Sequence, residues 1–220
     1  MIDKTDVNLR VVIWGASGHA LVVADILTLM GYKIEGYLDS VDPMRRNEIL
    51  GGAKVLGGLE QLPKLRDSGI NLMAMGIGNN ASRLSLASVA REQGFILPKL
   101  VHPEATIANT ADLGEGVVVA AGAVVNPYCR IESNAIVNTA ASIDHESNIN
   151  NCAHIAPGVQ IAGGVEIGSG AFVGIGSVIK DHVSIGARAI IGAGSLVLQD
   201  IPDDVVAYGV PAKVIRQVEG

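Results

Sequence analysis

The chain has 220 residues, which is enough for one large domain or two small ones. With 49% hydrophobic residues it can bury a core, so a disordered chain is excluded. Aromatic residues make up only 3% and the net charge is −6, which argues against a nucleic-acid binder with stacking rings and a basic face. The 27 glycines exceed the usual share of about 7%, and a core of small and branched residues suggests a repeat.

Nothing in the sequence indicates export or membrane insertion. Residues 1–10 are polar and of mixed charge, unlike a secretory signal, and no apolar run reaches the ~18 residues of a membrane span. The two cysteines, Cys129 and Cys152, are too few for a disulfide framework, and Cys152 is expected to face its own repeat. We therefore expect a cytoplasmic protein that binds neither membrane nor nucleic acid.

The N-terminal part alternates strand-like and helix-like segments. In chain order we expect a strand at 9–14, a helix at 20–30, a strand at 33–38, a short helix at 59–66, a strand at 71–77, a helix at 81–93 and a strand at 95–101. This alternation predicts a small parallel sheet of Rossmann type. Asn79 and Arg83 could line a ligand site, but a solvated helix start is the favoured interpretation.

A glycine turn follows the first strand. Gly15 and Gly18 would let backbone N–H groups approach a phosphate at the start of the next helix. Asp39 ends the second strand, where a ribose-binding carboxylate would lie. The turn lacks the full GxGxxG signature of dinucleotide enzymes, which disfavours an NAD-dependent oxidoreductase. The alternative to nucleotide binding is a packing turn beside a solvated aspartate.

From residue 107 the chain follows a strict six-residue period. Its first positions are all Ile, Val or Leu: Ile107, Leu113, Val119, Val125, Ile131, Val137, Ile143, Ile149, Ile155, Ile161, Ile167, Val173, Ile179, Ile185, Ile191 and Val197. Four residues after each comes a small or branched residue, such as Ala135 or Ser147. A period of six does not match the 3.6 of an α-helix. We expect a parallel β-helix with three hexads per coil and about five coils.

The whole chain resembles one family of hexapeptide sugar acyltransferases. The resemblance is carried by Gly15–His19, by Asn138–Glu146, by the segments His154–Pro157 and Ala162–Val165, and by the tail Tyr208–Lys213. The family includes the bacillosamine-pathway acetyltransferase, perosamine N-acetyltransferases and sialic acid O-acetyltransferases. The resemblance implies a left-handed β-helix and a homotrimer. It also implies that residues 1–101 bind a nucleotide-linked amino sugar and that residues 102–220 bind acetyl-CoA between subunits.

His145 is the candidate catalytic base. An amine or hydroxyl that attacks a thioester must lose a proton, and imidazole is suited to accept it. A neighbouring carboxylate would orient the ring; by resemblance it is Glu146, with Asp144 as the alternative. The other reading is a surface histidine in a charged turn. His102 and His182 are interpreted as structural.

The resemblance also implies ligand contacts. Acetyl-CoA would be bound by His154, Gly163, Ile175, Gly176 and Ala193, with the Gly163 N–H facing the oxyanion. The sugar nucleotide would be bound by Gly15, Ser17, Gly18, His19, Asp39, Ser40, Gly58 and Asn138. Some members carry Asp-Asp where this chain has Asp39-Ser40. The sequence therefore does not decide whether the base of the nucleotide is uracil, guanine or another. No His, Cys or Asp residues have metal-ligand spacing, and we expect no bound metal.

We therefore expect an acetyl-CoA-dependent N-acetyltransferase acting on a nucleotide-linked 4-amino-4,6-dideoxysugar, with a place in O-antigen or other glycan synthesis. A sialic acid-type O-acetyltransferase would use the same base and coenzyme and remains the alternative. A non-catalytic nucleotide-binding scaffold is a third possibility, against which the His145–Glu146 pair counts.

Overall fold

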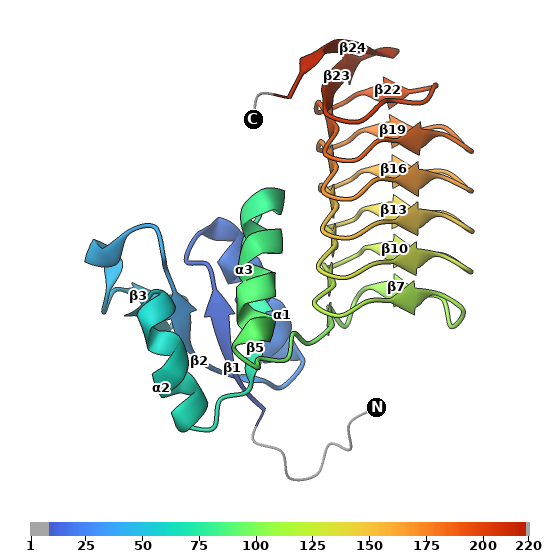
Figure 1. Cartoon of the computed structure of the whole chain (residues 1–220). Helices are drawn as coiled ribbons and strands as arrows, with labels where there is room; N and C mark the ends of the chain where they lie inside the picture. The colour runs from blue at the N-terminus through green and yellow to red at the C-terminus, as the bar shows by residue number, and fades with distance from the viewer. Residues whose placement is uncertain (1–8, 219–220) are drawn as a thin grey trace. The chain divides into compact units, whose positions relative to one another are not determined.

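The computed structural model describes residues 9–218, and its chain divides into two compact units (Figure 1). The first unit runs to Ile77 and resumes over Ala87–Pro98, while the second comprises Gly78–Leu86 and the chain from Lys99 onward. Residues 1–8, part of the stretch searched for a secretory signal, lie outside the described range. None of the helices between residues 9 and 218 is long and apolar enough to cross a bilayer.

The first unit is built on a five-stranded sheet of order β3-β4-β2-β1-β5, in which only the β3–β4 pair is antiparallel. Its strands are β1 (Arg10–Trp14), β2 (Lys33–Leu38), β3 (Ile49–Leu50), β4 (Ala53–Gly57) and β5 (Leu72–Met75). The helical segments are α1 (Gly18–Leu29), η1 (Pro43–Arg45), η2 (Leu59–Gln61), α2 (Leu62–Asp67) and α3 (Asn80–Glu92), whose first turns belong to the second unit. The interior strand β1 is almost wholly buried, and the predicted Rossmann-like arrangement is confirmed.

The β3–β4 hairpin is absent from the sequence-based expectation. Its two-residue turn is Gly51-Gly52, and both glycines have positive φ, 50° and 86°. Such a turn matches the twist of paired strands, so the Gly-Gly pair is the signal that identifies the hairpin. Strand β3 itself has only two residues, too few for alternation to be visible.

The strand expected at 95–101 is wrong as a member of the first sheet. Ile96 makes only an isolated parallel bridge with Leu72. Strand β6 (Leu100–Val101) pairs instead with β9 (Val118–Val119) of the second unit. Pro98 between them has no N–H to donate to a ladder, which explains why a continuous strand cannot form.

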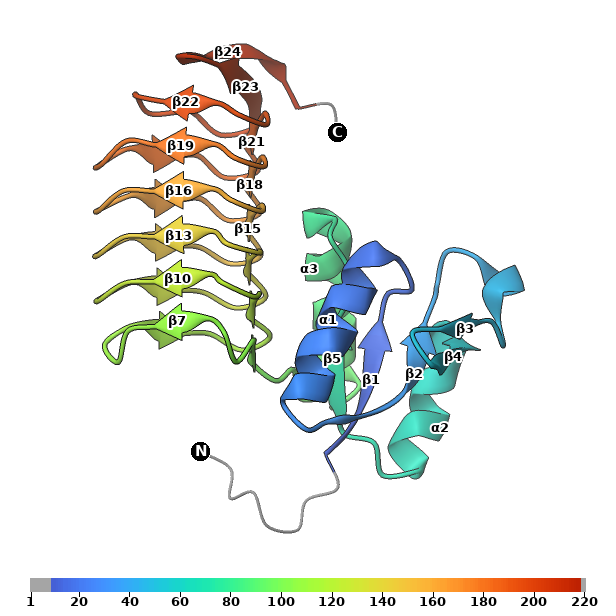
Figure 2. The same ribbon diagram turned by 180° about the vertical axis from the view of Figure 1, so that it is seen from behind.

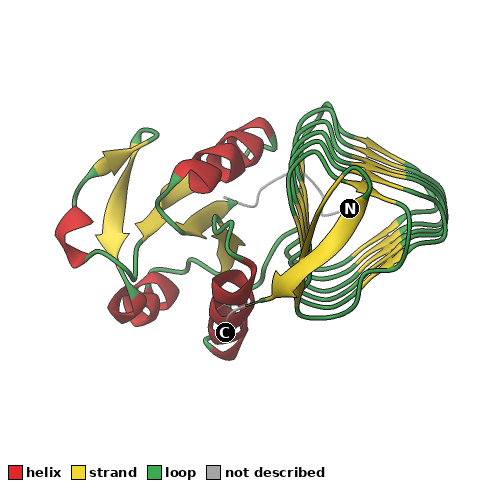
Figure 3. Ribbon diagram, turned by 90° about the horizontal axis from the view of Figure 1, so that it is seen from above, coloured by secondary structure: helices red, strands yellow, loops and turns green. Residues whose placement is uncertain are grey.

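The second unit is a parallel β-helix whose coils stack along one axis (Figures 1 and 2). From β6 to β19, each short strand pairs with the third strand after it in the chain, so three hexads form one coil, as predicted. Seen along the axis, each coil has three sides (Figure 3). The remaining strands are β7 (Thr106–Ile107), β8 (Asp112–Leu113), β10 (Val124–Val125), β11 (Arg130–Ile131), β12 (Ile136–Val137), β13 (Ser142–Ile143), β14 (Asn148–Ile149), β15 (His154–Ile155), β16 (Gln160–Ile161), β17 (Glu166–Ile167), β18 (Phe172–Val173), β19 (Val178–Ile179), β20 (Ser184–Ile185), β21 (Ile190–Ile191), β22 (Leu196–Val197), β23 (Val205–Gly209) and β24 (Ala212–Gln217).

The hexad pattern accounts for the core of this unit. From Val119 onward every aliphatic first position is buried. The small positions are buried as well, and where they are serine the hydroxyl finds a partner: Ser147 donates to the Ala162 carbonyl at 3.0 Å. A buried hydroxyl without such a partner would cost about 1–3 kcal/mol. The glycine excess and the scarcity of aromatic residues therefore follow from the narrow corners that recur in every coil of the β-helix.

The expectation of a solvated helix start is wrong for Arg83, which lies near the start of α3. The sequence favours a solvated helix start, yet this side chain is fully buried. Its Nε donates to the Asn134 carbonyl at 2.9 Å and its Nη2 to the Cys152 carbonyl at 2.8 Å. Desolvation lowers the pKa of the Arg83 guanidinium. The carbonyls that receive it belong to the β-helix, so the start of α3 is fastened to the coils within the second unit.

Candidate active site

His145 and Glu146 occupy a corner of the β-helix, between β13 and β14. The His145 Nδ1 lies 3.1 Å from the Glu146 Oε2, and both side chains are largely exposed, 56% and 70%. Because an ionised carboxylate only accepts, the pair places the imidazole proton on Nδ1 and leaves the lone pair on Nε2. Asp144, the alternative orienting carboxylate, instead accepts from the His145 backbone N–H at 2.8 Å.

Glu146 has a positive φ of 60°, uncommon for a side chain of its size. The equivalent corner residues Asn134, Cys152 and His182 have it too. The conformation is therefore a property of the scaffold's corners and not a strain specific to this pair.

The imidazole of His145 lies against Gly163, one coil further along. A Cβ at Gly163 would fall 2.6 Å from the ring Cε1 and 2.7 Å from Nε2, so only glycine leaves room for the ring in this position. The Gly164 N–H donates to the His145 carbonyl at 2.9 Å and fixes the two coils in register. The structure gives the Gly163 N–H no acceptor within residues 9–218, so it remains available to a ligand.

His154 lies on a different side of the coil from His145. It is buried in β15, and its ring meets the Phe172 ring edge-on with centroids 5.2 Å apart. Its Nε2 lies 3.1 Å from the Asn138 Nδ2, and its Nδ1 lies 3.3 Å from the Gly78 carbonyl. Two of the predicted ligand residues, His154 and Asn138, are thus in direct contact.

The other residues predicted to bind acetyl-CoA lie at a second corner. Ile175 and Gly176 follow β18, and Ala193 occupies the same corner one coil later; the Gly194 N–H donates to the Ile175 carbonyl at 2.8 Å. Ile175, Gly176 and Ala193 are exposed. Within one chain this corner and the His145 corner are separated by the side that carries β13, β16 and β19. The single chain therefore does not bring the candidate base and these three residues together.

The glycine turn of the first unit joins β1 to α1. Gly15 has φ +119°, and a Cβ there would lie 2.4 Å from the Gly76 carbonyl oxygen. Ser17 is the residue before the helix, and its side chain makes no capping hydrogen bond. Gly18 and His19 form the first turn of α1, whose N-terminal amides favour an anion.

Asp39 and Ser40 lie at the carboxyl end of β2, next to this turn. Asp39 Oδ1 accepts from the Val41 N–H at 2.9 Å, and its Oδ2 meets Arg45 at 3.1 Å. Arg45 also donates to the Ala16 carbonyl, which links the two loops. Gly58 is buried against them: a Cβ there would lie 3.2 Å from the Asp39 carbonyl oxygen. The predicted residues of the first unit thus gather at one edge of its sheet.

Comparisons with protein families and with solved structures bear on this arrangement. Residues 10–90 match the family model described as the PglD N-terminal domain, and residues 164–199 match the bacterial transferase hexapeptide model of six repeats. The structure of PerB from Caulobacter crescentus, in complex with CoA and GDP-perosamine, is 40% identical. The match covers 94% of this chain and 97% of that one, with a TM-score of 0.90. This chain belongs to the PglD-type family of hexapeptide sugar acyltransferases.

Other solved structures agree with this assignment. The acetyltransferase domain of PglB from Neisseria gonorrhoeae FA1090, in complex with acetyl coenzyme A, is 33% identical; the match covers 94% of this chain and 100% of that one, with a TM-score of 0.88. WeeI from Acinetobacter baumannii AYE, at 24% identity, 94% and 99% coverage and a TM-score of 0.81, shares the fold. The protein is accordingly an acyltransferase with a left-handed β-helix, in agreement with the sequence-based prediction.

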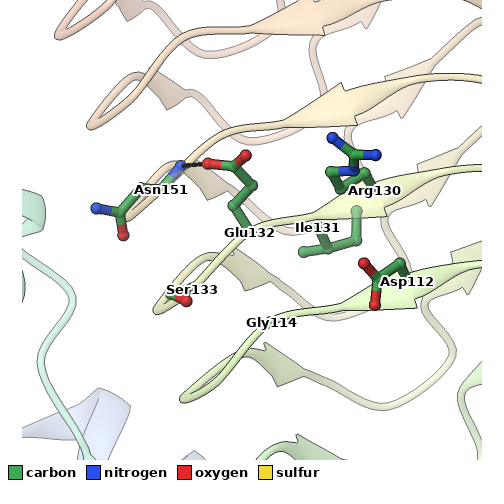
Figure 4. Close-up of a pocket in the computed structure, with 7 residues that line it drawn as sticks. All are labelled: Asp112, Gly114, Arg130, Ile131, Glu132, Ser133 and Asn151. Carbon is green, nitrogen blue, oxygen red and sulfur yellow. Dashed lines mark hydrogen bonds between the residues drawn. The ribbon is translucent and has the colours of Figure 1, made fainter.

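A depression on the acyltransferase's second unit lies elsewhere. It has about 490 Å³ and is lined by residues of β8, β11 and the corners that follow (Figure 4): Asp112, Gly114, Arg130, Ile131, Glu132, Ser133 and Asn151. None of the predicted site residues lines it. Among residues 9–218, no group of three His, Cys, Asp or Glu side chains could hold a metal ion.

The sequence-based interpretation misses Arg45, and it considers Arg83 only as a ligand-site residue or part of a solvated helix start. Arg45 links the loops of the first unit, and Arg83 contacts main-chain carbonyls of distant coils. Arg45 lies in a segment without periodicity, and main-chain acceptors leave no mark in a sequence. The His102 Nδ1 accepts from the Glu104 N–H at 3.0 Å. The His182 ring packs against Gly164, where an added Cβ would lie 2.5 Å from the His182 Nδ1.

Proposed function

We propose that this acyltransferase transfers the acetyl group of acetyl-CoA to the amino group of a nucleotide-linked 4-amino-4,6-dideoxysugar. The observation that carries the proposal is the His145–Glu146 pair at 3.1 Å, with the imidazole lying against Gly163, which has no side chain to displace it. The relatives support the substrate class, because PerB was solved with CoA and GDP-perosamine.

The chemistry is a direct transfer. The sugar amine attacks the thioester carbonyl while the His145 Nε2 takes a proton from the nitrogen, and Glu146 stabilises the imidazolium that forms. The carbonyl oxygen becomes an oxyanion facing the Gly163 N–H, a type of contact worth about 3 kcal/mol in other acyl transfers. Collapse breaks the carbon–sulfur bond, and the proton held by His145 goes to the departing thiolate. The products are the N-acetyl sugar and CoA.

Each unit takes one substrate in this proposal. The anionic diphosphate of the sugar nucleotide lies at the start of α1, over Gly15, Ser17, Gly18 and His19, with Asp39, Ser40 and Gly58 beside it. Acetyl-CoA contacts His154, Gly163, Ile175, Gly176 and Ala193, and Asn138 contacts the sugar. The functional division after residue 101 belongs to the same proposal. No metal has a role in it.

The assembly we propose is a homotrimer. The separation of the His145 corner from the Ile175 corner within one chain supports it, because a second subunit could bring an Ile175 corner to a His145 corner. Exposed apolar side chains on the coils, including Val178 and Leu198 at 42% each, are consistent with a covered surface. We further propose a cytoplasmic location and a place in O-antigen or related glycan synthesis.

The decisive experiment is a substrate panel. The protein is incubated with acetyl-CoA and UDP-, GDP- or dTDP-linked 4-amino sugars, or with free sialic acid, and release of the CoA thiol is followed. We expect turnover with one or more amino sugars. Turnover with sialic acid alone would establish the O-acetyltransferase instead, since the same base can deprotonate a hydroxyl.

The base is tested with His145→Ala. Removal of a general base should lower kcat by about 10²–10⁴-fold while the fold is kept. His182→Ala, at the same corner two coils beyond His145, is the matched control and should stay near the wild-type rate. A His145→Ala variant with near-normal kcat would refute the mechanism.

A further inference from the structure

Ser147 is a fully buried serine at the corner that carries His145. Its Oγ accepts a hydrogen bond from the Val165 N–H at 3.1 Å and donates one to the Ala162 carbonyl at 3.0 Å. A hydroxyl has a single proton to donate, so the bond received from Val165 leaves that proton for the Ala162 carbonyl. The serine therefore connects the two ends of the turn that contains Gly163, one coil further along.

This bridge takes the place of the hydrogen bond that closes other turns of the β-helix. At several corners the carbonyl at the start of the turn accepts directly from the N–H three residues later, as the Asn138 carbonyl does from Ala141 at 3.1 Å. In the turn over residues 162–165 the Ser147 hydroxyl bonds both groups instead. The Ala162 carbonyl is thus held by a side chain of the preceding coil.

The fold itself does not require a hydroxyl at this position. At the same corner in other coils, and at the next corner along the chain in every coil, most of the equivalent residues are apolar: Ala111, Val165 and Val183, and Val117, Ala135, Ala153, Ala171 and Ala189. The other polar residue at the Ser147 corner is Cys129, whose Sγ lies 3.0 Å from the Asp144 carbonyl. Cys129 and Ser147 therefore hold the carbonyls of the residues just before His145 and just before Gly163.

Two further buried serines lie at the other corner of the candidate site. Ser177 and Ser195 donate to the Gly192 carbonyl at 3.1 Å and 2.7 Å. Gly192 comes just before Ala193, one of the residues predicted to contact acetyl-CoA. Serines at the small position of the hexad thus occur at the two corners that carry predicted site residues.

The hydrogen bond at Ala162 acts on the amide that follows it. In a trans peptide the carbonyl and the N–H point in opposite directions, so a carbonyl bound by the buried Ser147 directs the Gly163 N–H away from the coil interior. A hydrogen bond accepted by the carbonyl also polarises the peptide and makes its N–H a stronger donor. Because the His145 ring lies against Gly163, this N–H is presented next to the candidate base.

We infer that Ser147 is a positioning residue that, through the Ala162 carbonyl, directs and polarises the Gly163 N–H for the oxyanion of the acetyl transfer. The inference rests on the proposed function, in which this N–H faces the thioester oxygen. That oxygen gains its charge only as the transition state forms. Loss of the hydroxyl should therefore lower kcat and leave KM for acetyl-CoA nearly unchanged.

A matched pair of substitutions separates the hydroxyl from the size of the side chain. Threonine and valine have nearly the same shape, but only threonine keeps the hydroxyl. Both should fit, since valine occupies the equivalent buried position in the next two coils, at Val165 and Val183. Ser147→Thr should keep kcat within about twofold of wild type. Ser147→Val should lower kcat about tenfold, which is less than the roughly 10²–10³-fold cost of removing an oxyanion donor outright.

Steady-state kinetics with the sugar that the substrate panel identifies measure both variants, well below the Tm of each. Equal kcat values for Ser147→Thr and Ser147→Val would overturn the inference. So would a rise in KM for acetyl-CoA as large as the fall in kcat, because it would mean that the hydroxyl acts on coenzyme binding.

Val183→Ala, at the same corner two coils beyond Ser147, is the control for a change of packing. It removes two carbons from a buried side chain that makes no hydrogen bond, and it should keep both kcat and KM. A loss of kcat in Val183→Ala equal to that in Ser147→Val would show that the rate responds to packing alone and would overturn the inference.

A readout independent of turnover is the nitrogen-15 NMR spectrum of the glycine-labelled full chain, in which the Gly163 signal is identified by its loss in Gly163→Ala. A hydrogen bond on the preceding carbonyl deshields an amide nitrogen. The Gly163 signal should therefore move upfield in Ser147→Val and stay in place in Ser147→Thr. An unmoved signal in Ser147→Val would overturn the inference, whereas an inactive wild type that shows the expected shift would refute the proposed function alone.

Ser147→Cys keeps the test open if Ser147→Val fails to fold. Cys129 shows that a thiol at this position can hold a carbonyl of the next coil, but a thiol is a weaker donor than a hydroxyl. We expect Ser147→Cys to lower kcat about threefold and to move the Gly163 signal upfield by less than the valine variant would. A wild-type kcat together with an unmoved Gly163 signal would overturn the inference.

Discussion

The ring of His145 lies against Gly163, a residue that has no side chain. Gly163 has no positive φ, so its own conformation would accept alanine; the obstacle is the ring, 2.6 Å from where the new Cβ would be. The glycine at this position is thus required by the imidazole and not by the turn.

We therefore expect Gly163→Ala to fold and to lose activity. Displacement of the imidazole by about 1 Å from its productive position can cost about 10²-fold in rate. Steady-state kinetics of the purified variant measure this, with circular dichroism to verify the fold. An unchanged kcat would show that the ring has another equally productive position.

A double variant shows whether the glycine acts through the histidine. In a His145→Ala background no ring remains to be displaced, so adding Gly163→Ala should lower the residual rate by less than about twofold. A full additional loss would mean that the added methyl group acts without the ring, for example by keeping a ligand away from the Gly163 N–H.

The sequence predicts some of these residue contacts and not others. His145 and Glu146 are adjacent in the chain, and Gly163 follows His145 by three hexads, one full coil, so the hexad period alone places these residues together. Arg83 could not be placed this way. Its acceptors are carbonyls 51 and 69 residues away, and a carbonyl is present at every residue.

At the scale of elements, the loop after β2 is tied to the glycine turn by one side chain. Arg45 contacts Asp39 and the Ala16 carbonyl, and its ion pair with Glu48 raises the pKa of Arg45. Most helices and strands of the first unit were predictable from its periodicity, but the β3–β4 hairpin was not. This tether was not, because it joins two irregular segments.

Arg45→Met should weaken binding of the sugar nucleotide. Without the tether the two loops lose their fixed spacing, and we expect KM for the nucleotide sugar to rise about tenfold while KM for acetyl-CoA is unchanged. Arg10→Met is the control, since Arg10 forms its ion pair with Glu35 and donates to the Ser68 carbonyl. A rise in both KM values, or in neither, would contradict the assignment.

The Arg10–Glu35 pair between β1 and β2 makes the first unit sensitive to acid. The hydrogen bond from Arg10, helped by Lys33, lowers the pKa of Glu35 from 4.5 to about 2. A lowered carboxyl pKa stabilises the fold above the unfolded-state value, and this contribution is lost as pH falls from about 4.5 toward 2.

Glu35→Gln should therefore have a lower Tm than wild type at pH 7 and a shallower fall in Tm between pH 4.5 and 2. Thermal unfolding at a series of pH values measures this, with the exposed Asp25→Asn as the control. Equal slopes for wild type and Glu35→Gln would show that the pair adds nothing to stability.

At the scale of the whole molecule, the proposal requires more than one chain. The sedimenting particle should have three times the 22.7 kDa mass of a single chain. Sedimentation equilibrium across a range of protein concentrations measures the mass. A monomer that is fully active would remove the intersubunit site from the proposal, although the His145–Glu146 pair would stand.

Stacking in coils of three hexads also constrains how this protein can change its length. Removal or insertion of one complete coil would shorten or lengthen the β-helix by a single layer of about 4.8 Å and leave every other side chain on its own face. An insertion of a single hexad would move all that follows to the next side of the coil. Evolution and protein engineering can therefore adjust the reach of the β-helix only in steps of one layer.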